Sequence, residues 1–221
     1  MPSSRSCGKL LAIVMILACG TASATGLDLA PYRMASAEEI ALARSAAPAS
    51  VAADAEVVVL GEQGYKTAVA GKNGFVCVVE RGWAVGFDDP QYLNIKIRAP
   101  ICFNAAAAKT VLAAYLERTK EVLAGLPTAA LRANARLSSW KPGPGAMCYM
   151  LSKQGYLSDA DRHWHPHLMF FVADSDAASW GANQKDSPVI AAKDPEDPTT
   201  TYMVKVDRWS DGSRDEVAAH H

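Results

Sequence analysis

The sequence predicts an α+β fold: a single domain with a mainly antiparallel sheet of about six strands and helices on one face. Half of the 221 residues are apolar and a fifth are charged, which is typical of a globular chain. Short β-branched or alternating segments lie between Gly, Pro and Asn residues, as strands do. These segments fall into two groups of three, and the residues between the groups have helical spacing.

The first residues have the features of a secretory signal peptide. A basic start at Arg5 and Lys9 precedes a short apolar run, and small residues end at Ala24. Because the run is too short to span a bilayer, we expect residues 1–24 to be removed, the protein to be exported (periplasmic or secreted), and no transmembrane segment. The residues around Cys19 also resemble a lipoprotein lipobox, so lipid anchoring through Cys19 is the alternative.

The remaining chain is slightly acidic, since the signal peptide contains two of the 22 basic residues and none of the 23 acidic ones. It has no basic run, and we expect no nucleic-acid partner. Three cysteines remain, Cys77, Cys102 and Cys148. In an oxidising compartment they predict one disulfide and one buried thiol, with the apolar Cys77 preferred as the thiol and all three pairings open.

The first part of the domain is predicted to be a helix followed by three strands. Ser36 and Glu39 have the spacing of a capping box, with Ser36 as the N-cap of a short helix that Pro48 ends. Asn73-Gly74 is typical of a hairpin loop and would join the second strand to the third. The strands are expected in meander order at 56–60, 65–70 and 75–80.

The middle of the chain is predicted to be helical after an irregular stretch at 82–103. Asn104 is the expected N-cap of a helix over 105–124, which has an apolar stripe and is followed by Gly125. A second, shorter helix is expected from 128 to 137.

The last part contains the second group of strands, predicted at 146–151, 168–172 and 200–206. Residues 173–199 are polar and rich in proline, so they are expected to form a lid, a binding loop or an Ω-loop. The domain is expected to span 25–209, followed by a flexible tail at 210–221.

The candidate functional site is a run of three histidines, His163, His165 and His167. Pro166 disfavours a helix there. In an extended chain alternate side chains share a face at intervals of about 7 Å, so the imidazoles would project to the same side. Because proline belongs at the start of a strand, the strand is expected to begin near His167, with His163 and His165 in a lead-in.

Imidazoles with this spacing predict a metal-binding or metal-dependent site for a divalent ion such as zinc. A catalytic zinc site uses three protein ligands, and nearby acids could supply a further one. Asp161 is the preferred acid, and Asp159 and Glu80 are the other candidates.

Other interpretations of the same residues stay open, and whether the protein is an enzyme is undecided. The histidines could form a polar rim around a core. Cys148 could act as a nucleophile beside a histidine. The protein could also be a non-enzymatic module that binds a small molecule or a protein through residues 173–199.

Familiar catalytic motifs do not account for the run. His165, His167 and Ser175 match three positions of a JAMM-type metalloprotease motif, but Ala178 occupies the position of its aspartate. The segments Gly71–Trp83, Arg98–Asn104 and Ala146–Val172 resemble a family of exported bacterial proteins. This resemblance covers most of the mature chain and implies no catalytic residues.

Overall fold

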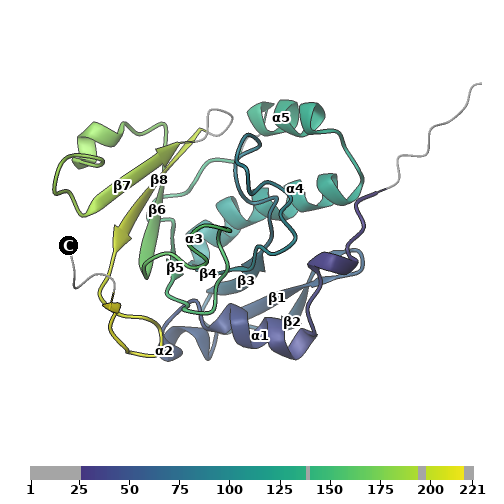
Figure 1. The fold of residues 1–221 in the computed structure, drawn as a ribbon, viewed down its shortest axis with the longest axis horizontal. Helices are drawn as coiled ribbons and strands as arrows, with labels where there is room; N and C mark the ends of the chain where they lie inside the picture. The colour runs from purple at the N-terminus through teal and green to yellow at the C-terminus, as the bar shows by residue number, and fades with distance from the viewer. Residues whose placement is uncertain (1–25, 138–139, 194–197, 217–221) are drawn as a thin grey trace, which may run out of the picture.

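One mixed sheet forms the centre of the computed structural model, which describes residues 26–137, 140–193 and 198–216 (Figure 1). Its strands lie in the order β2-β1-β3-β4-β5-β6-β8-β7. They are β1 (Glu56–Gly61), β2 (Gly64–Val69), β3 (Val76–Glu80), β4 (Ala99–Phe103), β5 (Met147–Met150), β6 (His167–Ala173), β7 (Val189–Lys193) and β8 (Thr199–Lys205). The α+β class is confirmed, but the described sheet has eight strands rather than six, and β1 and β3 are parallel.

Helices cover both faces of the sheet, which corrects the prediction that they lie on one face. α1 (Ser36–Arg44) packs on one face of β1, β3 and β4, and α4 (Ala113–Leu123) lies on the other side of the sheet (Figure 1). The other helical segments are η1 (Ala30–Tyr32), α2 (Ala49–Ala52), α3 (Ala105–Ala107), the π-helical η2 (Ala108–Leu112), α5 (Thr128–Leu137) and η3 (Ala177–Trp180).

The apolar residues of β1 explain this two-sided arrangement. Val57 and Val59 belong to the core beside α1, whereas Val58 and Leu60 belong to the core beside α4. All four side chains are buried. Burying one such side chain stabilises the fold by about 1.5–3 kcal/mol, so a strand that is apolar at consecutive positions needs cover on both faces.

The first three strands do not form the predicted meander. β1 and β2 pair as a tight hairpin that ends at Gly64, where φ is +112°. β3 lies on the other side of β1. Asn73 therefore belongs to a connection that crosses to the far side of β1, and its side chain donates to the carbonyl of Val51 at 2.8 Å.

β4 lies within the stretch 82–103 that was expected to be irregular. No strand was predicted there because of Pro100, since proline cannot donate a hydrogen bond to a neighbouring strand. Pro100 is opposite Val79, whose carbonyl accepts hydrogen bonds from Tyr65 Oη at 2.6 Å and from Arg81. The Val79 carbonyl thus accepts hydrogen bonds from side chains in place of the N–H that proline lacks.

The start of α1 differs from the predicted capping box. Ala35 is the N-cap, and Ser36 is the first helical residue. Glu39 points into the protein, where its Oε1 accepts hydrogen bonds from Leu60 N at 3.1 Å and from Arg81 Nη2 at 2.7 Å. The Glu39 and Arg81 side chains are 1% and 0% exposed, so this ion pair links α1 to the sheet from within.

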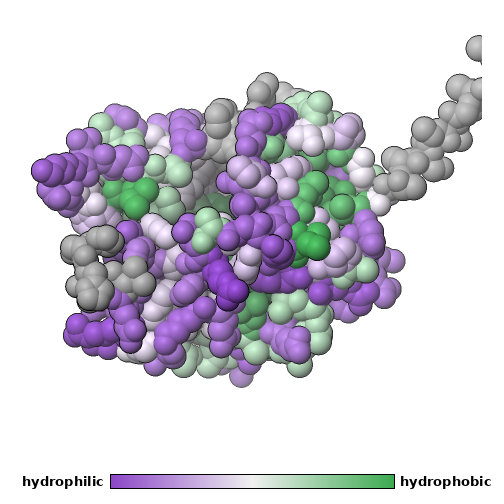
Figure 2. Space-filling view, in the orientation of Figure 1, coloured by the Kyte–Doolittle hydropathy of each residue, from purple (hydrophilic) through white to green (hydrophobic). Residues whose placement is uncertain are grey.

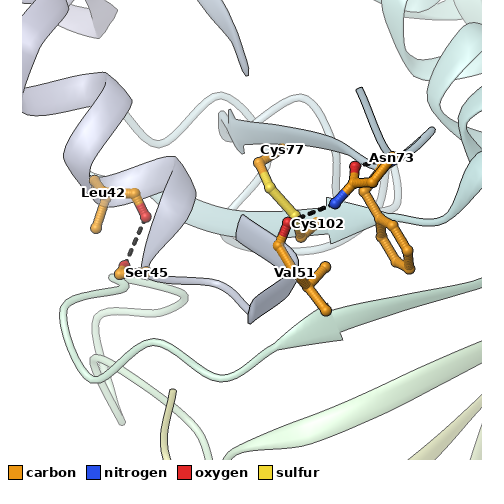
Figure 3. Close-up of a disulfide and its surroundings, with 7 residues drawn as sticks. Leu42, Ser45, Val51, Asn73, Cys77 and Cys102 are labelled. Carbon is orange, nitrogen blue, oxygen red and sulfur yellow. Dashed lines mark hydrogen bonds between the residues drawn. A yellow bond between two sulfur atoms is a disulfide. The ribbon is translucent and has the colours of Figure 1, made fainter. Parts of the chain in front are cut away.

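A disulfide joins Cys77 to Cys102, which are directly opposed on β3 and β4 (Figure 3). The expected set of one disulfide and one buried thiol is confirmed, but the free thiol is Cys148 rather than Cys77. Beside the disulfide, Ser45 Oγ donates to the carbonyl of Leu42 at 2.6 Å near the end of α1 (Figure 3).

The long central helix begins at Asn104, as predicted. The Asn104 side chain accepts a hydrogen bond from Ala107 N at 2.9 Å, and α3, η2 and α4 then follow without a break. Gly125 follows the helix with φ of +74°. The predicted second helix at 128–137 is confirmed as α5.

The loop before β7 covers part of the β7 edge of the sheet. The Asn183 side chain accepts a hydrogen bond from Ala191 N and donates one to the Ala191 carbonyl, both at 2.9 Å. Asn183 N donates to the carbonyl of Val189 at 3.0 Å. β7 itself lies within the segment 173–199, which was expected to be a loop.

Hydrophilic residues cover most of the face of the molecule that Figure 2 shows, with smaller groups of hydrophobic residues between them. No helix in the described ranges has both the length and the apolar character needed to cross a membrane. The predicted signal peptide, with Cys19, lies outside those ranges.

Candidate functional site

The histidine run leads into β6, which begins at His167 as predicted. Pro166 precedes the strand, and its carbonyl accepts a hydrogen bond from Val206 N at 2.9 Å. His163 and His165 belong to the lead-in. This arrangement places the run where β6 and the end of β8 lie side by side.

His167 is buried, with 3% of its surface exposed. Its Nδ1 lies 2.7 Å from the backbone oxygen of His165. A carbonyl can only accept, so Nδ1 is the donor, and Nε2 of the neutral ring has the lone pair. Burial lowers the pKa of His167; the hydrogen bond to the His165 carbonyl opposes this shift, and the nearby His165 ring adds to it.

His165 is held by a carboxylate from the end of the chain. Its Nδ1 lies 2.5 Å from Asp215 Oδ2, and the two side chains are 15% and 4% exposed. The carboxylate accepts this hydrogen bond, so Nε2 is again the nitrogen whose lone pair could bind a metal ion.

A compact turn brings Asp215 back to the histidines. Trp209 N donates to the Ser213 carbonyl, Gly212 has φ of +82°, and Asp215 N donates to the Asp207 carbonyl at 3.0 Å. These residues include part of the expected flexible tail at 210–221. Over its described part, to residue 216, the tail holds a buried carboxylate.

His165 and His167 line one small crevice, whereas His163 is not among its lining residues. The crevice has a volume of about 10 Å³, which is close to the space that one water molecule needs. Its walls are formed by Pro100, Met150, Ser152, Gly155, Leu157, Trp164, His165 and His167. The exposed His163 instead lies against Trp209, with ring centres 5.2 Å apart.

The acids expected as ligands lie elsewhere. Asp161 is exposed, and its backbone N–H donates to Ser158 Oγ. Asp159 accepts hydrogen bonds from Lys96 Nζ at 2.9 Å and from the Tyr156 hydroxyl at 2.6 Å. Within the described ranges, no three His, Cys, Asp or Glu side chains are grouped so that they could hold a metal ion.

The half-buried Glu80 and the buried Cys148 lie on the side of the sheet that faces α4. Burial raises the pKa of Glu80 to about 7, and Arg118 opposes this shift. Burial also raises the pKa of Cys148 well above its usual value, and Glu80 adds to the effect. A buried thiol of this kind is a poor nucleophile, and its partner across β5 and β6 is Met169 rather than a histidine.

Met150 is the crevice residue that the sequence interpretation missed. It lies in the segment 146–151, which was predicted only as a strand. In the structure it is directly opposite His167 in the β5–β6 ladder. Local spacing does not show which residue faces His167 across two strands, so the sequence alone could not place Met150 there.

A second hollow lies at the predicted binding loop. It has a volume of about 500 Å³ and is lined by Asp174, Ser175, Asp176, Ala177, Asn183, Ala191, Ala192, Lys193 and Thr200. Tyr202 supports this region, since its hydroxyl donates to the Asp176 carbonyl at 2.9 Å. Trp180 is 43% exposed and stacks on Tyr202, with ring centres 4.2 Å apart.

Comparison with known proteins gives no match for this chain, whether to a protein-family model, to a curated protein or to a solved structure. The two hollows and the side chains that line them are therefore the features that point to a function.

Proposed function

We propose that this protein binds a single transition-metal ion in the crevice between His165 and His167. One observation carries the proposal: both imidazoles line the same crevice, and each has its Nδ1 engaged by an oxygen acceptor. Histidines that bind metals through one nitrogen nearly always donate the other N–H to a carboxylate or a carbonyl.

The size and position of the crevice support the proposal. A volume near that of one water molecule suits one ion and excludes most organic substrates. Asp215 and the His165 carbonyl fix the two rings before the ion arrives, which lowers the entropic cost of binding. Few side chains that can donate to a metal line the crevice, so the expected role is binding rather than metal-dependent hydrolysis.

Metal titration of the full chain without a purification tag tests the proposal. Apo protein is expected to bind one equivalent of ion, with large losses of affinity in His165→Ala and in His167→Ala. His163→Ala is the matched control, because His163 belongs to the same run but lies outside the crevice. The proposal fails if the wild type binds no stoichiometric metal or if His163→Ala weakens binding as much as the other two changes.

The hollow of about 500 Å³ supports a second candidate, a module that binds a small polar ligand. Its volume lies in the range of small-molecule sites, and charged, hydroxyl and amide groups line it. A thermal-shift screen with small polar compounds tests this candidate. A compound that stabilises the wild type but not Lys193→Gln would support it, whereas equal shifts in both proteins would count against this hollow.

A further inference from the structure

A thioether lies beside the two imidazoles. Met150 and His167 are directly opposed in the β5–β6 ladder. Such cross-strand pairs place both side chains on one face, with Cβ atoms about 4.5–5.5 Å apart. Met150 and His167 also line the same crevice, together with His165.

This donor set discriminates between metals. Zinc sites use three or four ligands drawn from Cys, His, Asp and Glu, and no group of three such side chains occurs in the described parts of the chain. Thioether sulfur is a soft donor that selects Cu(I), and imidazole also suits copper. A thioether sulfur and imidazole nitrogens bring no negative charge of their own as ligands, which suits a monovalent ion. We infer that the crevice is a Cu(I) site with His165, His167 and Met150 as ligands.

The walls of the crevice favour the same ion. Pro100, Leu157 and Trp164 contribute apolar surface, and the Trp164 ring centre lies 4.7 Å from that of His167. An apolar shell limits the approach of water and disfavours the more highly charged ion. Cu(II) instead prefers a tetragonal set of nitrogen and oxygen ligands.

The inference rests on the proposed function and deepens it, so its test compares two ions. Apo full-length chain is titrated without oxygen with Cu(I), in competition with a chromophoric Cu(I) chelator, and separately with Zn(II). The variants are Met150→Leu and Met169→Leu, since leucine is close to methionine in volume. Met169 is the matched control, because it lies on β6 opposite Cys148 and does not line the crevice.

The wild type is expected to bind one Cu(I) more tightly than Zn(II). Met150→Leu should weaken Cu(I) binding at least about tenfold, since even partners beyond the ligands contribute 10–100-fold. Zn(II) binding should change far less, and Met169→Leu should behave as the wild type. X-ray absorption of the Cu(I)-loaded protein should show a copper–sulfur contribution that Met150→Leu removes.

Two results overturn the inference in different ways. If zinc binds at His165 and His167 while Cu(I) binding is weaker or insensitive to Met150→Leu, the metal site stands and its assignment to Cu(I) fails. If neither ion binds stoichiometrically, the proposed function fails as well. Circular dichroism of each variant shows whether a loss of binding reflects a loss of fold.

Discussion

His165 Nδ1 and Asp215 Oδ2 lie 2.5 Å apart, although the two residues are 50 positions apart in the chain. This hydrogen bond fixes the orientation of the His165 imidazole through the nitrogen that does not bind the proposed metal ion. Asp215→Asn should therefore weaken metal binding about 10–100-fold in the competition titration while His165 remains in place. Asp207→Asn is the control, because Asp207 belongs to the same turn but its side chain is exposed. Equal losses of metal affinity in both variants would show that the fold of the turn, and not the Asp215 carboxylate, determines metal binding.

The buried pair of Glu39 and Arg81 should be a major determinant of stability. Arg81→Met leaves the Glu39 carboxylate without its charged partner, which typically costs about 3–5 kcal/mol in the free energy of unfolding. Urea denaturation measures this change. The exposed pair of Arg33 and Glu62 supplies the control, because Arg33→Met should cost less than about 1 kcal/mol. A similar cost for the two variants would contradict this account.

The disulfide should contribute about 2–4 kcal/mol to the free energy of unfolding, as cross-links commonly do. Urea denaturation of Cys77→Ala/Cys102→Ala should show this loss. Thiol counting gives an independent check: among Cys77, Cys102 and Cys148, denatured protein should have one reactive thiol before reduction and three after it. Cys148 should react only when the protein unfolds, because its side chain is buried. Three thiols before reduction would rule out the disulfide.

Glu80 should make stability depend on pH. Its pKa is about 7 in the folded protein, above the ordinary 4.5, because burial disfavours the charged carboxylate more than Arg118 favours it. The raised pKa means that the stabilising contribution is fully present below pH 4.5 and is lost as pH rises through 7.

The variant Glu80→Gln isolates this effect. Between pH 5 and pH 8 the wild type should lose roughly 1–3 kcal/mol relative to Glu80→Gln in urea denaturation. Glu38→Gln, at an exposed position, should follow the wild type. The ionisable neighbours that interact with Glu80 are Arg118, Tyr65, Tyr115 and Cys148, and the last three have raised pKa values of their own. A Glu80→Gln profile parallel to that of the wild type would show that Glu80 does not titrate in this range.

Local patterns predicted those elements whose signals lie within a few residues. Asn104 and Gly125 mark the ends of the long helix because capping and left-handed backbone are local properties. The strand start at His167 followed from Pro166 in the same way. The order of the strands in the sheet could not be predicted from local patterns. The position of β3 beside β1 depends on which face of the sheet each apolar residue must bury.

In the candidate site, too, local patterns predicted some residues and missed those that distant parts of the chain contribute. The sequence singled out His165 and His167, which do share a crevice, and it included His163 and Asp161, which lie outside it. Asp215 and Met150 could not be assigned from spacing, because a turn at the chain end brings in the first and strand pairing brings in the second.

The side chain of Asn183 also affects how copies of this protein meet in a concentrated solution. β7 is one of the two edge strands of the described sheet, and an open strand edge offers main-chain groups to which another molecule can add a strand. At Ala191 both groups are already bonded to Asn183 within the same chain. The Asn183 side chain therefore occupies the position that a strand of a second molecule would take beside Ala191, which disfavours strand addition there.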